Sequence, residues 1–439
     1  MMTMMDTGSA HSSSSLSLLD AFANQDQQFA DAFSVLQKAI SDRAFPASSI
    51  AITHAGKLLA LKAFGHFTYD GPENDESGSA TNTSSSSLGA SFLASFARSG
   101  DSTTENLPVQ ISTLFDLASL TKIVATTPMA MLLYEHGLLD LDTPVAAIVP
   151  EFLGDVAKDE RRSIVTLRTL LAHSSGLPAY EKLFLKANSR DELLHSAFTM
   201  PLAADPGSRA VYSDIGFIIL GIALERLADE SLDRFCQREI FSPLAMTNTT
   251  FNPPLELRAQ IPPTADERPW GADTPVRETL KSHAQSSASQ QAARSTLRGR
   301  IIQGEVQDEN AYVLGGVAAH AGLFSTARDL AQFAQGMLNT GRSIFRAESI
   351  ALFTRCESPP LGAFRVLGWD TPSNSSQSGK YFSPHSFGHL GYTGTSLWID
   401  PTRQLSITLL TNRTWPDCSN HAIKQVRPKF HDAIVEALA

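Results

Sequence analysis

Cysteine, long apolar runs and excess positive charge are all scarce in this chain of 439 residues. The three cysteines, Cys236, Cys356 and Cys418, are far apart and odd in number, which excludes a disulfide framework and a cysteine-based metal cluster. No stretch of about 18 apolar residues occurs, so no membrane span is predicted. The formal net charge of -10 argues against nucleic acid and anionic membrane surfaces as partners.

The N-terminal segment also lacks the features of a secretory signal. It reads MMTMMDTGSAHSSSSLSLLDAF, with neither a basic stretch nor a continuous apolar one. We therefore expect a cytoplasmic protein, whereas a misplaced start codon would allow a periplasmic one. Residues 1–24 are interpreted as a disordered polar leader, and residues 25–439 as the folded part.

What the chain does contain is a pattern of strands and helices that predicts a mixed α/β fold. Residues 25–42 have apolar positions at helical spacing, and SSIAITHAGKLLALKAFG (48–65) indicates two strands joined by a tight turn. TSLWIDP and QLSITLLTN (395–412) indicate another strand pair, followed by an amphipathic helix at about 420–438. Strands at both ends around a helical middle favour one antiparallel sheet, flanked by helices and built from both chain ends.

The domain boundaries follow from the same pattern. We expect an α/β lobe from residues 25–70, 107–122 and 386–439, and a mostly helical lobe from residues 123–385. Residues 71–106 are rich in Ser, Thr, Gly and Asn and are predicted to be a flexible insertion that is dispensable for folding. A second interruption spans about 264–300. A cleft between two such lobes is a common place for a functional site.

The first candidate motif is FDLASLTK (115–122), in which Ser119 precedes Lys122 by one helical turn. This spacing brings the two side chains onto one face of a helix. A serine hydroxyl becomes a good nucleophile only when a base takes its proton. Lysine, with an ordinary pKa of about 10.4, can act as that base only if burial or a neighbour lowers its pKa. The alternative is that Ser119 caps a helix and Lys122 is solvated.

The second motif is VYSDIGFIILGIALERL, where Tyr212 directly precedes a long apolar helix pattern. From there Tyr212 could exchange protons with Ser119 or Lys122. Alternatively, Ser213 or Asp214 caps the helix and Tyr212 is a core aromatic residue.

The third motif is FGHLGYTGTSLWIDP, where Gly391 and Gly394 flank Tyr392 just before a predicted strand. Glycine near a strand often marks close approach of a ligand to the backbone. Backbone N–H groups there could hold a carbonyl oxygen as it gains negative charge. The alternative is a β-bulge with a structural His389.

Together and in this order, the motifs resemble those of the serine β-lactamase and penicillin-binding protein superfamily, especially its class C and esterase-like branch. That family combines Ser-x-x-Lys, Tyr-x-Asn or Ser-x-Asn, and Lys-Thr-Gly. The corresponding segments here are 119–122, 212–214 and 389–391. The stretches LLYEHGLLDLDTPV, TLRTLLAHSSGLP and GGVAAHAGLFSTARDL are also similar, and the resemblance covers about residues 43–66 and 107–438.

The resemblance implies a β-lactamase/transpeptidase-like fold and an acyl-enzyme formed on Ser119. Lys122 would be the proton partner of the serine, and Tyr212 would be a general base or a proton relay. The backbone N–H groups of Ser119 and Tyr392 would form the oxyanion hole. No metal and no organic cofactor is implied.

Departures from the family pattern bear on the substrate, which we expect Asp214, His389 and Gly391 to contact. Asp214 replaces an asparagine and adds negative charge. His389 and Leu390 replace the lysine and threonine that hold the substrate carboxylate in penicillin-recognising members, and they cannot supply a fixed cation with a hydroxyl. Among small ester, amide and β-lactam substrates, we therefore rank carboxylic ester hydrolysis first and β-lactam or D-amino-acid peptide hydrolysis second. A catalytically silent ligand-binding protein is a further alternative, although binding alone does not need the complete catalytic set.

Three further features carry weaker expectations. Pro128 falls inside the helix expected after Ser119, where it should remove one hydrogen bond and bend the axis. His173, in LLAHSSGLP, could pair with Ser119, but we favour a structural role because other residues fill the base positions. The loop VQDENAYVLGG, with residues 308–310, is a candidate to line the cleft. The sequence does not define the oligomeric state.

Overall fold

The computed structural model describes residues 18–69, 105–154, 159–268, 297–338, 343–357, 366–373 and 376–439. Apart from residues 105–106, the predicted insertion at 71–106 lies outside these ranges. Its dispensability for folding stays a prediction.

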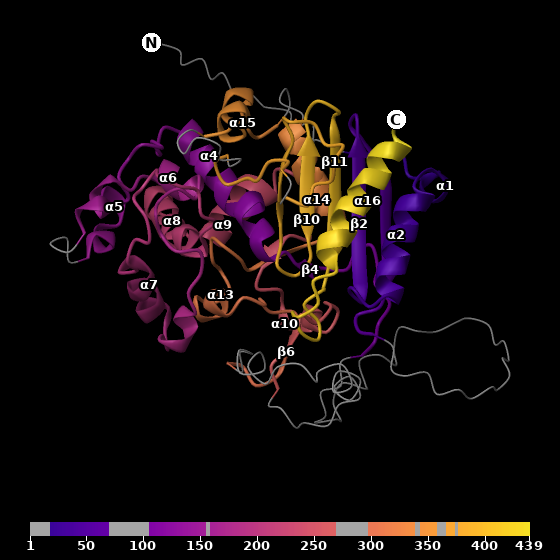
Figure 1. Cartoon of the computed structure of the whole chain (residues 1–439), viewed down its shortest axis with the longest axis horizontal. Coiled ribbons are helices and arrows are strands. Elements are labelled where there is room, and N and C mark those ends of the chain that lie inside the picture. The colour runs from indigo at the N-terminus through magenta and orange to yellow at the C-terminus, as the bar shows by residue number, and fades with distance from the viewer. Residues whose placement is uncertain are drawn as a thin grey trace, which may run out of the picture.

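A six-stranded sheet with the order β1-β3-β2-β11-β10-β9 forms one side of the molecule (Figure 1). Its strands are β1 (Leu19–Asp20), β2 (Ala47–His54), β3 (Lys57–Gly65), β9 (Phe387–Leu390), β10 (Ser396–Asp400) and β11 (Leu405–Thr411). β2 pairs antiparallel with β11, with Ala51 opposite Thr408. The N-terminal and C-terminal hairpins therefore meet in the middle of one sheet, which confirms the predicted assembly from both chain ends.

Helices cover both faces of this sheet, which explains why its central strands are apolar on both sides. On β2, Ile50 and Ile52 face one hydrophobic cluster, together with α2 (Ala30–Ser41) and α16 (Ile423–Ala437). Ala51, between them, faces the other cluster, to which α14 (Ala327–Leu338) belongs. Figure 1 shows α2 and α16 side by side over the near face, with α14 behind the sheet.

Two details at the N-terminal end differ from the expectation. Leu18 is buried in the core, and Leu19 pairs with Lys57 in a parallel register. Residues 18–24, which the prediction counted in the leader, therefore include a buried leucine and a short strand of the main sheet. The boundary of the leader stays a prediction. The predicted helix at residues 25–42 is divided into α1 (Gln25–Gln28) and α2 by Phe29, whose fully buried side chain sits on non-helical backbone.

The chain between the two hairpins is mostly helical and lies to one side of the sheet (Figure 1). Its α-helices are α4 (Thr127–Glu135), α5 (Val145–Ile148), α6 (Leu167–Leu171), α7 (Arg190–Phe198), α8 (Asp214–Ala228), α9 (Leu232–Cys236), α10 (Leu255–Arg258), α13 (Glu309–Val313) and α15 (Ala347–Phe353). Its short helical turns are η1 (Ala118–Leu120), η2 (Lys122–Thr126), η3 (Pro150–Leu153), η5 (Glu160–Ile164), η6 (Leu183–Leu185) and η7 (Gln237–Phe241). The lobe boundaries given above stay predictions.

Two small sheets accompany these helices. One has the order β4-β8-β5, and the other pairs β6 with β7. Their strands are β4 (Phe115–Asp116), β5 (Thr250–Phe251), β6 (Ala265–Asp266), β7 (Ile301–Ile302) and β8 (Leu323–Ser325). β6 lies within the second predicted interruption, about 264–300, and β7 directly follows it. Residues 269–296 of that segment lie outside the described ranges. None of the helices in the described ranges is long and apolar enough to span a bilayer.

Pro128 stands at the beginning of α4, directly after the π-helical turn η2. Proline has no N–H to donate to the carbonyl four residues earlier. A π-helical turn thus precedes the proline, and the predicted bend of the axis stays a prediction. This turn begins at Lys122, so the irregular helix carries a candidate catalytic residue.

Candidate active site

Ser119 lies on a sharp turn between the strand β4 and the helical segment η2. The preceding residue, Ala118, has a φ of 47°, which is a strained conformation for a residue other than glycine. The Asp116 carboxylate accepts hydrogen bonds from the N–H groups of Ala118 (2.8 Å) and Gln307 (2.7 Å). This buried carboxylate therefore holds the turn that presents Ser119.

Two side chains donate hydrogen bonds to the Oγ atom of Ser119. The Lys122 Nζ atom lies 3.2 Å away and the Tyr212 hydroxyl 2.7 Å away. Lys122 comes from the next helical turn, whereas Tyr212 comes from the segment just before α8. The structure thus brings together the three residues that the sequence motifs singled out.

Lys122 is fully buried, and its ammonium group is surrounded by acceptors. Besides Ser119, it contacts the carbonyl oxygen of His320 at 2.8 Å and Oδ1 of Asp214 at 2.7 Å. The ammonium group thus donates two hydrogen bonds and forms an ion pair with one carboxylate. A buried charge is stable only when it is paired and hydrogen-bonded in this way, so the site favours the charged form of Lys122 as a donor.

Asp214 is the first residue of α8, where a carboxylate also interacts favourably with the helix dipole. The structure places its carboxylate on Lys122, and the expected contact with the substrate stays a prediction. The neighbouring Ser213 caps α8, because its Oγ atom accepts the Gly216 N–H at 3.0 Å. The capping alternative is therefore correct for Ser213.

Tyr212 is held between two imidazole rings. Its ring centroid lies 4.8 Å from that of His173 and 5.6 Å from that of His389. His173 also accepts the Ser213 N–H at Nδ1 (3.0 Å), which fixes the backbone beside Tyr212. These contacts support the structural role expected for His173.

His389 belongs to β9 and is only 4% exposed. Its Nδ1 atom lies 2.8 Å from the carbonyl oxygen of Leu390, and its ring packs on Tyr212. The sequence analysis placed His389 among the substrate-contacting residues. In the structure its ring packs against Tyr212, and its contact with the substrate stays a prediction.

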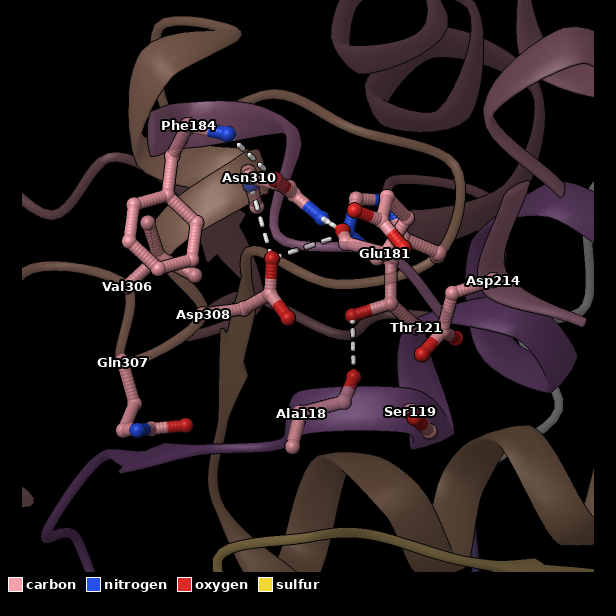
Figure 2. A network of polar contacts seen from close by, with 12 residues as sticks. Ala118, Ser119, Thr121, Glu181, Phe184, Asp214, Val306, Gln307, Asp308 and Asn310 are labelled. Atoms are coloured by element: carbon pink, nitrogen blue, oxygen red, sulfur yellow. Dashed lines mark hydrogen bonds and ion pairs between the residues drawn. The ribbon is translucent and has the colours of Figure 1, made fainter. Parts of the chain in front are cut away.

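Two residues reach the site without having been assigned a role. The Nε2 atom of His320 lies 2.9 Å from Oδ1 of Asp308, while the backbone of His320 binds Lys122. Burial alone would raise the pKa of Asp308, but His320, the N–H of Ala311 and the charge of Lys122 together lower that pKa below its usual value. The nearby Asn310 is fully buried and joins Glu181 and Phe184, as Figure 2 shows.

The turn that carries Tyr392 is bonded to the segment just ahead of Ser119. The hydroxyl groups of Thr393 and Thr395 donate to the carbonyl oxygens of Asp116 (2.8 Å) and Leu117 (3.0 Å). These bonds fix the turn after β9 against the strand that leads into the nucleophile.

Gly391 permits the close approach of the two segments. A Cβ atom at this position would lie 2.5 Å from the carbonyl oxygen of Leu117, so only glycine fits. Within the described ranges, the backbone N–H groups of Ser119 and Tyr392 donate no hydrogen bond to another protein atom. Both N–H groups therefore remain available to a ligand on neighbouring segments.

The same part of the chain provides no obvious cation site. Among the residues that the structure describes, no group of three or more His, Cys, Asp or Glu side chains is arranged to hold a metal ion. The chemistry that the site offers is that of a serine hydroxyl, a phenol and an ammonium group.

Comparison with other sequences places this geometry in context. The sequence pattern of a family described as Beta-lactamase matches residues 24–426. An Escherichia coli (strain K12) protein named "Putative D-alanyl-D-alanine carboxypeptidase" is 34% identical over 318 residues, which cover 69% of this chain and 69% of that protein. The N-acetylmuramyl-L-alanine amidase of Bacillus subtilis (strain 168) is 34% identical over 320 residues, covering 69% of this chain and 68% of the amidase.

Solved structures share the fold at lower identity. EstCE1, described as a hydrolase with promiscuous acyltransferase activity, superposes with a TM-score of 0.65 at 20% identity, covering 94% of this chain and 100% of the other. Simvastatin synthase (LovD) from Aspergillus terreus, in its unliganded form, gives a TM-score of 0.60 at 20% identity, covering 93% of this chain and 98% of the other.

Proposed function

The chain belongs to the β-lactamase family as a serine hydrolase of the β-lactamase and penicillin-binding protein superfamily, and we propose that it acts through an acyl-enzyme on Ser119. The observation that carries the proposal is the pair of hydrogen bonds from Lys122 and Tyr212 to the Oγ atom. A hydroxyl joined to both a phenol and an ammonium group can lose its proton as it attacks a carbonyl carbon.

In the proposed reaction, Tyr212 moves the proton and Lys122 supplies charge. The Tyr212 hydroxyl, which donates to Ser119 in the resting structure, first releases its proton to solvent. The resulting phenolate accepts the hydroxyl proton of Ser119 while Oγ bonds to the substrate carbonyl carbon. Lys122 stays an ammonium group, since it forms an ion pair with Asp214 and donates to the His320 carbonyl, and its charge stabilises the phenolate. Tyr212 then gives the proton to the leaving group as the scissile bond breaks. Water hydrolyses the acyl-Ser119 ester by the reverse path.

The carbonyl oxygen gains negative charge when Oγ attacks. The N–H groups of Ser119 and Tyr392 are the proposed donors to this oxyanion, because neither is donated within the described ranges. Preorganised donors of this kind contribute about 3 kcal/mol each to lowering the barrier.

We propose a carboxylic ester as the first substrate class. The position of the family's lysine carries the packed imidazole of His389, and the negative charge of Asp214 lies beside Lys122. A substrate with a free carboxylate close to the reacting bond would meet a carboxylate here rather than a fixed cation. Esters, which carry no charge at that place, avoid the repulsion.

A second candidate is the amide bond between a muramyl lactyl group and L-alanine. The Bacillus subtilis relative is named for this activity. In such a substrate the reacting amide is internal and has no free carboxylate next to it. The absence of a carboxylate-binding cation from the site therefore does not weaken its binding. The terminal carboxylate of a D-alanyl-D-alanine peptide, by contrast, would lie near Asp214 and His389. We therefore rank carboxypeptidase and β-lactamase activities below ester hydrolysis and muramyl amide hydrolysis.

Labelling with a fluorophosphonate probe, followed by peptide mapping, tests the nucleophile. We expect one adduct, on Ser119, and no adduct with Ser119→Ala. An adduct on another residue would overturn the assignment, and a wild-type protein that never labels would indicate the silent ligand-binding alternative.

A substrate panel tests the chemistry of the bond. It contains short p-nitrophenyl esters, N-acetylmuramyl-L-alanyl-D-isoglutamine, a D-alanyl-D-alanine peptide and a chromogenic cephalosporin. We expect the highest kcat/KM on the esters, or on the muramyl amide if the second candidate is correct. Preference for the D-alanyl-D-alanine peptide or the cephalosporin would contradict both.

A further inference from the structure

The turn at residues 391–395 is held from behind by two buried arginines that belong to neither the motifs nor the contacts of Ser119. Arg427, on α16, donates to the carbonyl oxygens of Gly391 (2.8 Å), Gly394 (3.2 Å) and Thr395 (2.8 Å). Arg413, just after β11, donates to the carbonyl oxygen of Tyr392 at 2.7 Å. Its guanidinium also lies 4.6 Å from the centroid of the Tyr392 ring.

These contacts orient the peptide units of the turn. The C=O of Gly391 and the N–H of Tyr392 belong to one planar trans peptide, so they point in opposite directions. Because Arg427 binds that C=O, the N–H of Tyr392 must point away from α16. The hydroxyl of Thr393 bonds the turn to Asp116 on the segment before Ser119, which fixes the turn from the opposite side.

Arg427 is an unusual residue to bury. It is 4% exposed, and within the described ranges it has no carboxylate partner, since its fourth acceptor is the side-chain amide oxygen of Gln377. Burial, with a contribution from the charge of Arg413, lowers the pKa of Arg427 to about 9. The desolvation cost of this cation is offset mainly by the three carbonyl groups of the turn, with Gln377 as the fourth acceptor. The geometry of Arg427 and that of the turn therefore depend on each other.

We propose that Arg427, assisted by Arg413, is a positioning residue for the oxyanion hole that holds the N–H of Tyr392 toward the reacting carbonyl. This inference rests on the proposed acyl-enzyme and adds to it the residue that fixes one of its donors. The positive charges behind the turn also polarise the peptide that carries the N–H, which makes it a better donor to a developing oxyanion.

The test compares Arg427→Lys with Arg162→Lys. A lysine keeps the charge but cannot bridge three carbonyl oxygens with a planar fork. Arg162 is a matched control, because it is also buried and also donates to backbone carbonyls, those of Phe152, Met200 and Phe198. It takes part in none of the contacts around Ser119.

Three experiments are done on each variant. The first measures the rate of fluorophosphonate labelling of Ser119, and the second measures kcat and KM on p-nitrophenyl acetate. The third measures the affinity for phenylboronic acid, which forms a tetrahedral adduct. For Arg427→Lys we expect labelling, kcat and boronate affinity to fall about tenfold or more, with KM nearly unchanged, because the lost interaction is made mainly in the transition state. For Arg162→Lys we expect all values to stay within about twofold, even where its melting temperature falls equally.

An Arg427→Lys protein that labels and turns over within about twofold of the wild type would overturn the proposal. If Arg427→Lys does not fold, Arg413→Lys decides the question by the same three measurements. For Arg413→Lys we expect the labelling rate, kcat and the boronate affinity to fall about threefold or more, and smaller changes reject the proposal. Failure of the proposed function itself looks different, since the wild type would then carry no adduct on Ser119.

Discussion

The Nζ atom of Lys122 lies 2.7 Å from Oδ1 of Asp214, so residues from two separate motifs form one ion pair beside the nucleophile. The Lys122 side chain is completely buried and that of Asp214 is 16% exposed. The pair keeps a cation next to Ser119 while placing an anion at the same end of the site. In the proposed mechanism, proton transfer then falls mainly to Tyr212, and we expect anionic substrates to be disfavoured.

Replacing Asp214 with asparagine restores the residue typical of the family and leaves Lys122 without its carboxylate. We expect Asp214→Asn to lower the free energy of unfolding by about 1–3 kcal/mol, less than for a fully buried pair because Asp214 is partly exposed. The ratio of kcat/KM for an anionic cephalosporin to that for p-nitrophenyl acetate should rise. Urea unfolding and the two kinetic measurements check this, and an unchanged ratio would show that Asp214 does not set substrate charge.

Tyr212→Phe and Lys122→Ala should each slow acylation by about a hundredfold or more, in line with general acid-base contributions. Their stabilities should differ, because phenylalanine still packs between His173 and His389. Lys122→Ala, by contrast, leaves Asp214 without its partner. Burst kinetics and thermal unfolding measure the two effects. Wild-type acylation by Tyr212→Phe would reassign the proton acceptor.

His389→Lys tests the missing cation directly. We expect ester turnover to fall, since the imidazole that packs on Tyr212 is lost, while cephalosporin acylation rises relative to ester turnover. Adding Leu390→Thr should increase the relative gain by restoring the hydroxyl. Mass spectrometry of the acyl-enzyme provides the measurement, and His389→Gln is the uncharged control. The same cephalosporin-to-ester ratio for the lysine and glutamine variants would count against the charge argument.

Asp116 predicts a pH dependence of stability. Burial raises its pKa from 3.8 to about 6, although the N–H groups of Ala118 and Gln307 oppose the rise. The folded state therefore holds a proton between about pH 4 and 6 that the unfolded state has released, so this residue's contribution is fully favourable below the unfolded pKa and is lost as pH rises through about 6. The loss is roughly 3 kcal/mol for a group with these values.

Urea unfolding at several pH values, for the wild type and Asp116→Asn, measures this contribution. The Asp116→Asn variant lacks one carboxylate oxygen as a hydrogen-bond acceptor at every pH. Its free energy of unfolding is therefore lower by the same amount across the pH range. We expect the wild type to lose more stability than the variant between about pH 4 and 7. Parallel curves would mean that Asp116 does not titrate in this range.

The sequence was sufficient to predict the strand pairs at both chain ends and the grouping of Ser119, Lys122 and Tyr212. Alternating or periodic apolar residues identify strands and helices locally, and the order of three motifs matched a family pattern. The structure confirms the single sheet, through the β2–β11 pairing, and it brings the three side chains together.

Contacts between distant segments could not be predicted in this way. The hydrogen bond from Lys122 to the His320 carbonyl joins residues 198 positions apart, and the local sequence around neither residue predicts it. The motif position of His389 likewise does not reveal that its ring packs on Tyr212. The arginines behind Tyr392 carry no motif at all.

The pairing of β2 with β11 has a consequence for how the protein is made. Thr53 on β2 and Ser406 on β11 bond to each other across 353 positions of sequence. During synthesis the helical middle leaves the ribosome before β11 and α16 have been made. The edge of β2 that pairs with β11 is therefore unpaired for most of translation. Chains released early lack both the central sheet partner and Arg427. If Arg427 positions the oxyanion hole as proposed, activity is acquired only after β11 and α16 have been synthesised.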